Sequence, residues 1–473
     1  MNTTREELPR LVHDHQALVD LFDATWELMP GYWRRGEPGS GFDRVFCDPA
    51  QDRVNQVAAC CSTFSLVYSN REFPVEAQLD AFYAKQQPCG AIHGEYSLLN
   101  GQPFLIKANP HGVQAPLFAW AEYNLYHRLG SKRRLREVLP ILERYYQWIQ
   151  ASFRRDNGLL AVPRQALGMG NSPRDRIAYP VDFNAQQAAS ASFISTIADA
   201  LNDKEVAFRY KREYFALKTR MQSLMWSDED SIYYDLDRYG QQLKVKTIAA
   251  FWTLLAEIPS EDKARRLIGH LTNPRTFGRS HPFPSLAAEE ALYDPYGGGY
   301  RGSVLPYVNY AIIKGLERYG RISLAREFAL RHLFAMHDVL VPERGVGDLW
   351  DAYAPEHESA AKWHGKGGFP RKSYLPFVAL STVALVIENV LGLSISLPRK
   401  TVDWTLPVLE GMGIENLTLK RNLVSIRTHN SDRGWEVRLE SEKLYYLAIH
   451  VLGRRRKTLP IPSGKCAILV DKI

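Results

Sequence analysis

The chain has 473 residues, of which 45% are hydrophobic and 23% charged, so it can bury a large core and is not an intrinsically disordered protein. The net charge of +7 is not gathered into a long basic run, because the clearest run, residues 454–457, is short, and we expect no nucleic-acid partner. The five cysteines are odd in number and form no CxxC pair, which argues against a disulfide framework and favours a reducing compartment. The sequence shows neither an apolar stretch of about 18 residues nor the core of a signal peptide, so we expect no membrane span and a cytoplasmic location.

Apolar residues recur at helical spacing over most of the first 393 residues. The first helical pattern falls within residues 1–40 and contains Leu11, Leu18, Leu21, Phe22 and Trp26. Further helices are predicted over residues 54–69, 74–87, 112–130, 133–153, 184–201, 204–226, 243–256, 260–271, 303–319, 323–338 and 372–391.

The predicted helices follow one another in pairs, joined alternately by short loops and by long loops such as residues 272–302 and 341–371. A ring of such pairs would bring the long loops to one mouth, where function concentrates. No fixed repeat period supports the alternative of an open solenoid. From residue 394 onward, apolar and polar residues alternate between short turns, which is typical of strands. We therefore predict a helical domain over residues 1–393 and a small antiparallel, sandwich-like β domain over residues 394–473.

The loop Gly168-Met169-Gly170-Asn171-Ser172-Pro173-Arg174 lies between two long helical segments. It resembles the loop Gly-Met-Asp-Asn-Ser-Pro-Arg of inverting glycosidases in the family of glucosidase I and mannosylglycerate hydrolase, which are related to trehalases. Further strings that resemble this family follow its order, at residues 114–121, 234–237, 300–310 and 349–356. The resemblance implies a mainly α fold, an (α/α)6 toroid barrel followed by a small C-terminal antiparallel β domain.

The departures from the family fall on its sugar-binding and catalytic positions. The general acid of the family reads Gly170, and its general base, a Glu, reads Asp351. The family's Gln-Trp-Asp, which holds sugar hydroxyls, reads Gln56-Val57-Ala58. Inverting hydrolysis needs two carboxyls roughly 6.5–9.5 Å apart, and the acid contributes on the order of 10²–10⁴-fold. Glycine can transfer no proton, so ordinary hydrolysis by the family's route is expected to be crippled.

The catalytic candidates are Asp351 as a base and Asp175 as a relocated acid, although Asp175 could instead be a solvated partner of a neighbouring arginine. Asp182 is expected either to cap the following helix or to pair with Arg174. The residues expected to contact the ligand, on the resemblance and on their place in the loops, are Arg174, Asn171, Gln114, Tyr300, Arg301, Trp350, Tyr353 and Arg371.

Three alternatives accompany these candidates. Arg174 and Arg301 could brace the loops instead of binding a ligand. Arg371 and Lys372 depart from the family and suggest a ligand more anionic than a plain glucoside. Glu95 could line the mouth, but we expect it to form a structural ion pair.

The histidines of the mouth loops, His281, His357 and His364, follow no known spacing of metal ligands. We expect no metal and no cofactor. Three functions stay open: a remodelled pocket that binds a polar or glycosylated small molecule and performs non-standard chemistry or none, a working inverting α-glycosidase that uses Asp351 and Asp175, and a non-catalytic partner-binding protein. The sequence leaves the oligomeric state open.

Overall fold

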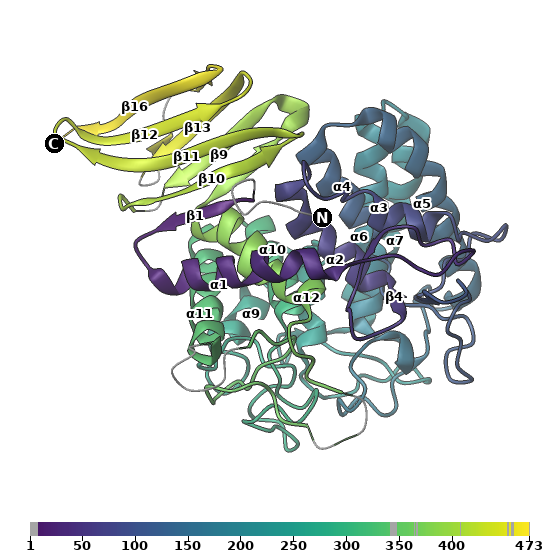
Figure 1. Ribbon diagram of the computed structural model, residues 1–473. Helices are drawn as coiled ribbons and strands as arrows, with labels where there is room; N and C mark the ends of the chain where they lie inside the picture. The colour runs from purple at the N-terminus through teal and green to yellow at the C-terminus, as the bar shows by residue number, and fades with distance from the viewer. Residues whose placement is uncertain are drawn as a thin grey trace.

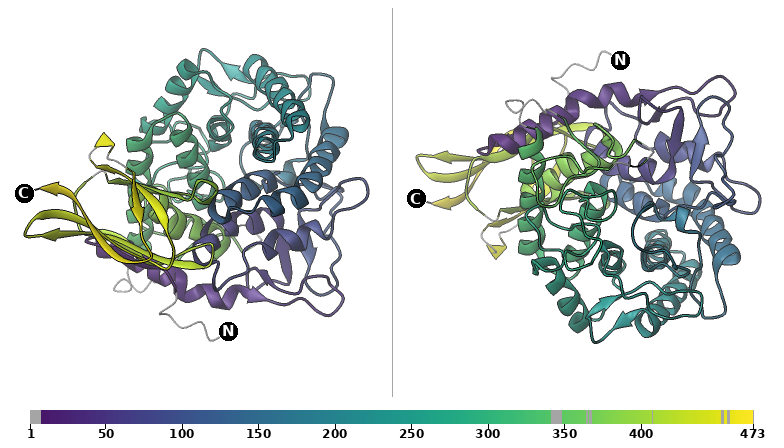
Figure 2. Two further views of the ribbon diagram at one scale, coloured as in Figure 1. Left: turned by 90° about the horizontal axis from the view of Figure 1, so that it is seen from above. Right: turned by 90° about the horizontal axis from the view of Figure 1, so that it is seen from below.

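The computed structural model describes residues 8–340, 348–363, 365, 368–406, 408–451, 454–455 and 458–472. Helices form an (α/α)6 barrel, and two β-sheets pack beside one end of it (Figure 1). The views along the barrel axis show the helices around a ring, with the β domain attached at one side (Figure 2). The mainly α fold with a small C-terminal β domain, predicted from the sequence, is confirmed.

The barrel has an inner layer of buried helices and an outer layer of amphipathic helices. Helices α2, α6 and α10 and the π-helix η7 are buried on nearly every face, as expected for an inner layer. The outer helices α5, α7 and α9 bury one stripe and begin at Ser131, Asp203 and Ser260, whose side chains accept a backbone N–H of the first turn. The α-helices are α1 (Gln16–Leu28), α2 (Gln56–Leu66), α3 (Ala77–Tyr83), α4 (Phe118–Leu129), α5 (Lys132–Phe153), α6 (Val181–Ala200), α7 (Lys204–Leu224), α8 (Trp252–Leu255), α9 (Glu261–Thr272), α10 (Pro306–Arg318), α11 (Ile322–Leu340) and α12 (Leu375–Ala379). The other helices are η2 (Met29–Tyr32), η3 (Val67–Ser69), η4 (Arg164–Ala166), η5 (Ile248–Phe251), η7 (Leu380–Val390) and η8 (Leu397–Arg399).

The β domain consists of two sheets whose facing side chains are buried. One sheet has the order β1-β10-β11-β12-β16, and the other has the order β14-β13-β9-β8, with β15 also paired to β13. All these pairs are antiparallel except β9 with β13, which is parallel. The strands are β1 (Arg10–His13), β8 (Leu393–Ser396), β9 (Thr401–Leu406), β10 (Met412–Leu419), β11 (Asn422–Ser431), β12 (Gly434–Ser441), β13 (Tyr445–Val451), β14 (Arg454–Arg455), β15 (Leu459–Ile461) and β16 (Gly464–Lys472). Short two-stranded pairs join the barrel loops: β2 (Trp33–Arg34) with β3 (Val45–Phe46), β4 (Arg53–Asn55) with β5 (Glu95–Ser97), and β6 (Trp226–Ser227) with β7 (Ile232–Tyr233).

Three predicted elements were wrong at their N-terminal ends. The helix predicted from residue 243 begins at Ile248, because Thr247 forms an antiparallel bridge with Leu286 and is extended. Leu11 lies in strand β1, not in a helix, because residues 10–13 pair with β10 at the edge of the C-terminal sheet. The helix predicted from residue 112 begins at Phe118, because the Asn109 side chain binds the backbone N–H and C=O of Val113 and holds that segment in a loop.

The division of the chain into two domains after residue 393 stays a prediction.

Long loops gather at the barrel end away from the β domain, which is drawn at the bottom of Figure 1. At the other end, the carboxylate of Glu388 on η7 accepts hydrogen bonds from Tyr68 (2.5 Å), Arg128 (2.8 Å) and Tyr310 (3.0 Å) and pairs with Lys314 (2.8 Å). Burial by itself would raise the pKa of Glu388, but Lys314 and Arg128 outweigh burial and hold this pKa at about 2. This cluster ties α4, α10 and η7 together.

We expect the substitution Glu388→Gln to lower the free energy of unfolding at pH 7 by roughly 3 kcal/mol, because it leaves Arg128 and Lys314 without their shared carboxylate. The pKa of Glu388 is depressed in the folded state, from 4.5 to about 2, so its contribution is present above pH 4.5 and is lost as the pH falls towards 2. Urea unfolding at several pH values between 2 and 7 measures this. The exposed pair of Glu440 and Lys465 supplies the control Glu440→Gln; parallel stability curves for wild type and Glu388→Gln would contradict the assignment.

Candidate active site

A cavity of about 390 Å³ opens among the loops that connect the inner helices of the barrel. Its carboxyl groups belong to Glu95, Asp182 and Asp351. Side-chain amides come from Gln51, Asn55, Gln114, Gln165 and Gln186. Aromatic side chains come from Trp252, Tyr300, Tyr307, Phe369, Tyr374 and Phe377. A cavity of this size lined by rings and amides fits a polar small molecule.

The loop of residues 168–174, called the motif loop below, is anchored by its last residue, Arg174, whose side chain is almost fully buried. Arg174 Nη1 and Nη2 donate to the two oxygens of Asp182 (2.9 and 2.8 Å), and Nε and Nη2 donate to Asp235 (2.7 and 2.8 Å). Asp182 lies in the first turn of α6, so its pairing with Arg174 is confirmed, whereas the cap position belongs to Pro180. Asp235 also accepts the backbone N–H of Val181 (2.8 Å). With these donors engaged, Arg174 braces the loop and does not contact the cavity, which corrects its assignment to ligand binding.

Gly168 and Met169 line the cavity and Gly170 follows them on the exposed side of the same loop. A Cβ added at Gly170 would meet no atom within 4 Å among the described residues, and its φ is not in the left-handed region. The backbone therefore tolerates a side chain at the position that reads Asp in the family.

Asp175 does not take the place of the missing acid. Its side chain is 80% exposed and pairs with Arg164, and it is not among the residues that line the cavity. The structure thus favours the solvated-partner alternative for Asp175, with Arg164 in place of the neighbouring arginines.

Asp351 lines the cavity but is held by Arg371. Arg371 Nε donates to Asp351 Oδ2 and the Arg371 backbone N–H donates to Oδ1, both at 2.6 Å. The Arg371 guanidinium stacks over the Tyr374 ring, 3.3 Å from its centroid. Burial raises the pKa of Asp351, and Arg371 acts in the opposite direction. A water molecule would have to compete with this arginine for the carboxylate before Asp351 could act as a base.

Of the other predicted ligand contacts, Gln114 and Tyr300 line the cavity, whereas Asn171, Arg301, Trp350 and Tyr353 do not. Asn171 fixes the neighbouring glycine-rich loop, since its Nδ2 donates to Gly298 O (2.7 Å) and its Oδ1 accepts the Tyr300 N–H (2.6 Å). The side chain of Asn171 occupies the space where a Cβ of Gly299 would lie, and Gly299 has a φ of +70°, so this position requires glycine.

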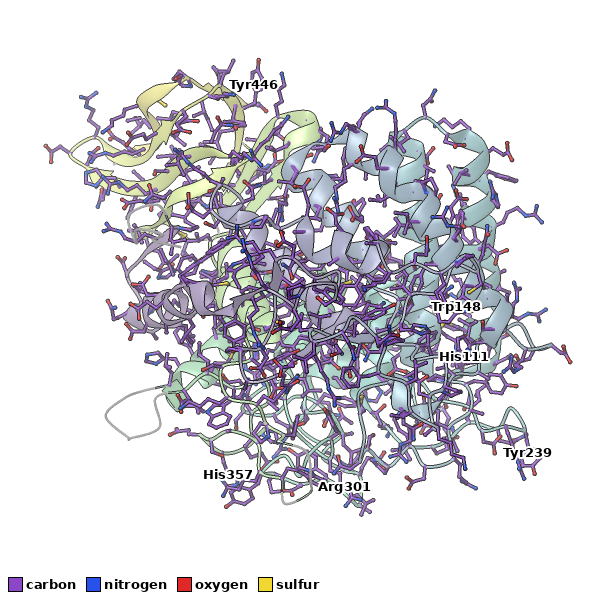
Figure 3. The ribbon with its side chains drawn as sticks, turned by 45° about the vertical axis from the view of Figure 1, so that its right-hand side comes forward. His111, Trp148, Tyr239, Arg301, His357 and Tyr446 are labelled. Carbon is purple, nitrogen blue, oxygen red and sulfur yellow. The ribbon has the colours of Figure 1, made fainter. Side chains whose placement is uncertain are left out.

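The remaining three residues support the loops from outside the cavity. Arg301 donates to Asn171 O (3.2 Å) and lies at the outer loop end of the molecule, as does His357, opposite Tyr446 of the β domain (Figure 3). Tyr353 is fully buried, and its hydroxyl accepts the backbone N–H of Trp350 (2.9 Å). None of these three side chains lines the cavity, and the assignment of Arg301 and Tyr353 to ligand contact is corrected to loop support.

Among the described residues there is no group of three or more His, Cys, Asp or Glu side chains placed to hold a metal ion. His281 is buried and contacts His332 (2.6 Å between ring nitrogens), while His357 stacks on Tyr296. His364 lies outside the described residues. No helix in the described part of the chain has the length and apolarity needed to cross a bilayer.

Glu95 forms the ion pair expected from the sequence, with Arg53, but it is also the site residue that the sequence reasoning left out of the candidate ligand contacts. It lines the cavity, and its ion pair with Arg53 is long at 3.9 Å. No motif marks Glu95 in the sequence, because its place at the cavity follows from the pairing of β5 with β4. Among the described lining residues, three carboxyls stand against one cation, Arg371. Lys372 pairs with Asp348 and does not line the cavity. This balance counts against the expectation of an anionic ligand.

A family model for the mannosylglycerate hydrolase MGH1-like glycoside hydrolase domain matches residues 78–370, and a model for the trehalase C-terminal domain matches residues 392–473. An uncharacterised protein of Borreliella burgdorferi is 42% identical over 477 residues, which cover 99% of this chain and 100% of that protein.

Solved structures share the fold. The GH63 mannosylglycerate hydrolase from Thermus thermophilus, in complex with glucose, has a TM-score of 0.62 at 19% identity and covers 77% of this chain and 99% of that one. A GH78 family rhamnosidase of a Bacillus species has a TM-score of 0.69 at 14% identity and covers 94% of this chain and 42% of that one. At these identities the likeness shows the fold alone.

The bracing role of Arg174 predicts that Arg174→Met lowers the free energy of unfolding by about 3–5 kcal/mol, because Asp182 and Asp235 would be left as buried carboxylates without their cation. Chemical denaturation followed by fluorescence measures the change. Arg133→Met removes an arginine whose side chain is 87% exposed and should change stability by less than about 1 kcal/mol. A loss of under about 1 kcal/mol in Arg174→Met would show that the loop does not depend on this pairing.

Proposed function

The chain belongs to the family of mannosylglycerate hydrolase MGH1-like glycoside hydrolases, and from this premise we propose that its mouth cavity binds a sugar-like small molecule without the two-carboxyl hydrolysis of an inverting glycosidase. The family and the glycosidase fold are shown by the matching models. The altered chemistry and the ligand are the parts that we propose.

One observation supports the proposal above the others: the position that reads as the family's acid is a glycine, and the position that reads as its base is bound by an arginine. Gly170 has no proton to transfer, and Asp351 is engaged by both the backbone and the guanidinium of Arg371. Without a general acid, the rate of hydrolysis is expected to fall by a factor on the order of 10²–10⁴. The cavity, however, keeps the amides and aromatic rings that suit hydroxyl-rich ligands. The lining of the cavity therefore supports the binding of a sugar-like ligand but does not support its hydrolysis.

A structural neighbour supports the class of ligand. The mannosylglycerate hydrolase of Thermus thermophilus forms a complex with glucose. We transfer from that protein only the idea of a sugar-sized, hydroxylated ligand, which fits a cavity of about 390 Å³.

The alternative of a working inverting α-glycosidase relies on Asp175 as a relocated acid. The exposure of Asp175 and its pairing with Arg164 disfavour this role, because a proton donor has to reach the bond between the two sugar units. The further alternative of a protein that only binds a macromolecular partner has no specific surface in its favour among the described residues, whereas the cavity has a defined polar lining.

We expect the wild-type protein to bind a simple sugar such as glucose but to leave aryl glucosides and mannosides at background rates of hydrolysis. A ligand at about 100 times its dissociation constant should stabilise the protein by about 2.7 kcal/mol, which thermal unfolding can detect. Ala115→Trp places an indole at a lining position and should abolish that stabilisation. If glucose stabilises Ala115→Trp as much as it stabilises wild type, the ligand does not bind in this cavity.

Gly170→Asp tests the missing acid directly, since the position has open space and an ordinary φ. The variant should hydrolyse aryl glycosides faster than wild type. The gain should be about 10²-fold if Arg371 releases the Asp351 carboxylate so that it can act as the base. Release of the anomeric product, followed by NMR, measures rate and stereochemistry together. Rapid inverting hydrolysis by the wild type, abolished in Asp175→Asn, would establish the alternative mechanism instead.

A further inference from the structure

Strand pairing fixes a polar corner of the cavity from three residues. Strands β4 and β5 are antiparallel, and their register places Asn55 directly opposite Glu95. Asn55 also caps α2, because its Oδ1 accepts the backbone N–H of Ala58 (3.0 Å). With its oxygen committed to the helix, Asn55 directs Nδ2 to Glu95 Oε1 and to Gln114 Oε1, both at 3.0 Å. The amide orientation of Asn55 is therefore set by the helix terminus.

Glu95 differs from the other two carboxyls of the cavity in its access to a ligand. Asp182 is bound by Arg174 at 2.8 and 2.9 Å, and Asp351 is bound by Arg371 at 2.6 Å. Glu95 has a side chain that is 33% exposed, and the guanidinium that pairs with it, that of Arg53, is 3.9 Å away.

Arg53 is in turn held against another side chain. Its guanidinium stacks on the Phe104 ring, 3.7 Å from the centroid, and its side chain is 52% exposed. An ion pair this long and this solvated neutralises Glu95 weakly. Among the described lining residues, Glu95 is thus the carboxylate that can still accept hydrogen bonds from a ligand.

Gln114 complements Glu95. The Oε1 atom of Gln114 accepts a hydrogen bond from Asn55, which sets the orientation of the amide. Its Nε2 has no hydrogen-bond partner among the described residues and can donate to a ligand. Glu95 Oε2 is an acceptor on the same corner. A donor beside an acceptor matches a hydroxyl pair, and the carboxylate also matches an ammonium group.

We propose that Glu95 and Gln114, oriented by Asn55, determine the specificity of the cavity, and that the ligand presents to them a neutral diol or an ammonium-bearing polyol, not an acidic group. This inference rests on the proposed function, because it assumes that the cavity binds a sugar-like molecule. The charge balance of the cavity agrees with it, since a ligand carboxylate would meet Glu95 with only Arg371, already paired to Asp351, as a cation among the described lining residues. The expectation of an anionic ligand, drawn from Arg371 and Lys372, is thereby replaced.

Isothermal titration calorimetry of the full chain with three ring-matched probes tests the proposal: glucose, glucosamine and glucuronate. In wild type, glucuronate should bind at least about tenfold more weakly than glucose or glucosamine, because its charge repels Glu95. In Glu95→Gln this order should collapse, with glucosamine losing about tenfold and glucuronate gaining. Gln114→Met retains the carboxylate but removes the donor, so it should weaken all three probes while keeping their order.

Glu137→Gln makes the same chemical change on the exposed face of α5 and should leave all three affinities unchanged. Thermal unfolding of each variant confirms that it is folded. Glucuronate that binds wild type as tightly as glucose, or unchanged probe ratios in folded Glu95→Gln, would overturn the role of Glu95 while leaving the sugar site intact. If no probe binds wild type, or if glucose binding survives Ala115→Trp, the proposed function itself fails and this inference with it.

Discussion

The guanidinium of Arg174 lies between the carboxylates of Asp182 and Asp235, and the mouth of the barrel depends on this arrangement. It joins the motif loop to the first turn of α6 and to the loop that follows β7. A buried cation with two carboxylates is stable only when the geometry satisfies all of its donors, and here four of the contacts are 2.9 Å or shorter. This pairing thus fixes the loop without any contribution from a side chain at position 170.

The residues that brace the loops and the candidate reacting groups are under different physical constraints, which is why the family is shown and the reaction is proposed. Packing residues such as Arg174 and Asn171 maintain the loops through contacts with other protein atoms. The groups that would meet a glycosidic bond are under a different constraint, since they stabilise no fold. Gly170 could lose its carboxyl, and Asp351 could be enclosed by Arg371, without disturbing the barrel.

The same separation accounts for the polar corner at Glu95. Asn55 serves the fold through its oxygen, which caps α2, and serves the cavity through its nitrogen, which orients Glu95 and Gln114. In our proposal the specificity of the cavity is thereby linked to the N-terminus of α2. In our proposal the amides and aromatic rings of this cavity receive hydroxyl groups, and the carboxylate of Glu95 discriminates against an acidic ligand.

The sequence by itself determined the family, the helical barrel and the β-rich C-terminal region, because apolar spacing and short ordered motifs are local properties of the chain. It also placed Gln114 and Tyr300 near the cavity, and its reading of Gly170 as the position of the family's acid stays a prediction. Only the tertiary structure decided between the two roles expected for Asp182, added Asp235 as a second partner of Arg174, placed Arg371 on Asp351, and joined residues 10–13 to the C-terminal sheet. These outcomes depend on which charged groups and strands the folded loops bring into contact, from 8 residues apart for Arg174 and Asp182 to the two ends of the chain for β1 and β10. Sequence spacing leaves such pairings undetermined, since an arginine that could bind a ligand and one that braces a loop have the same side chain.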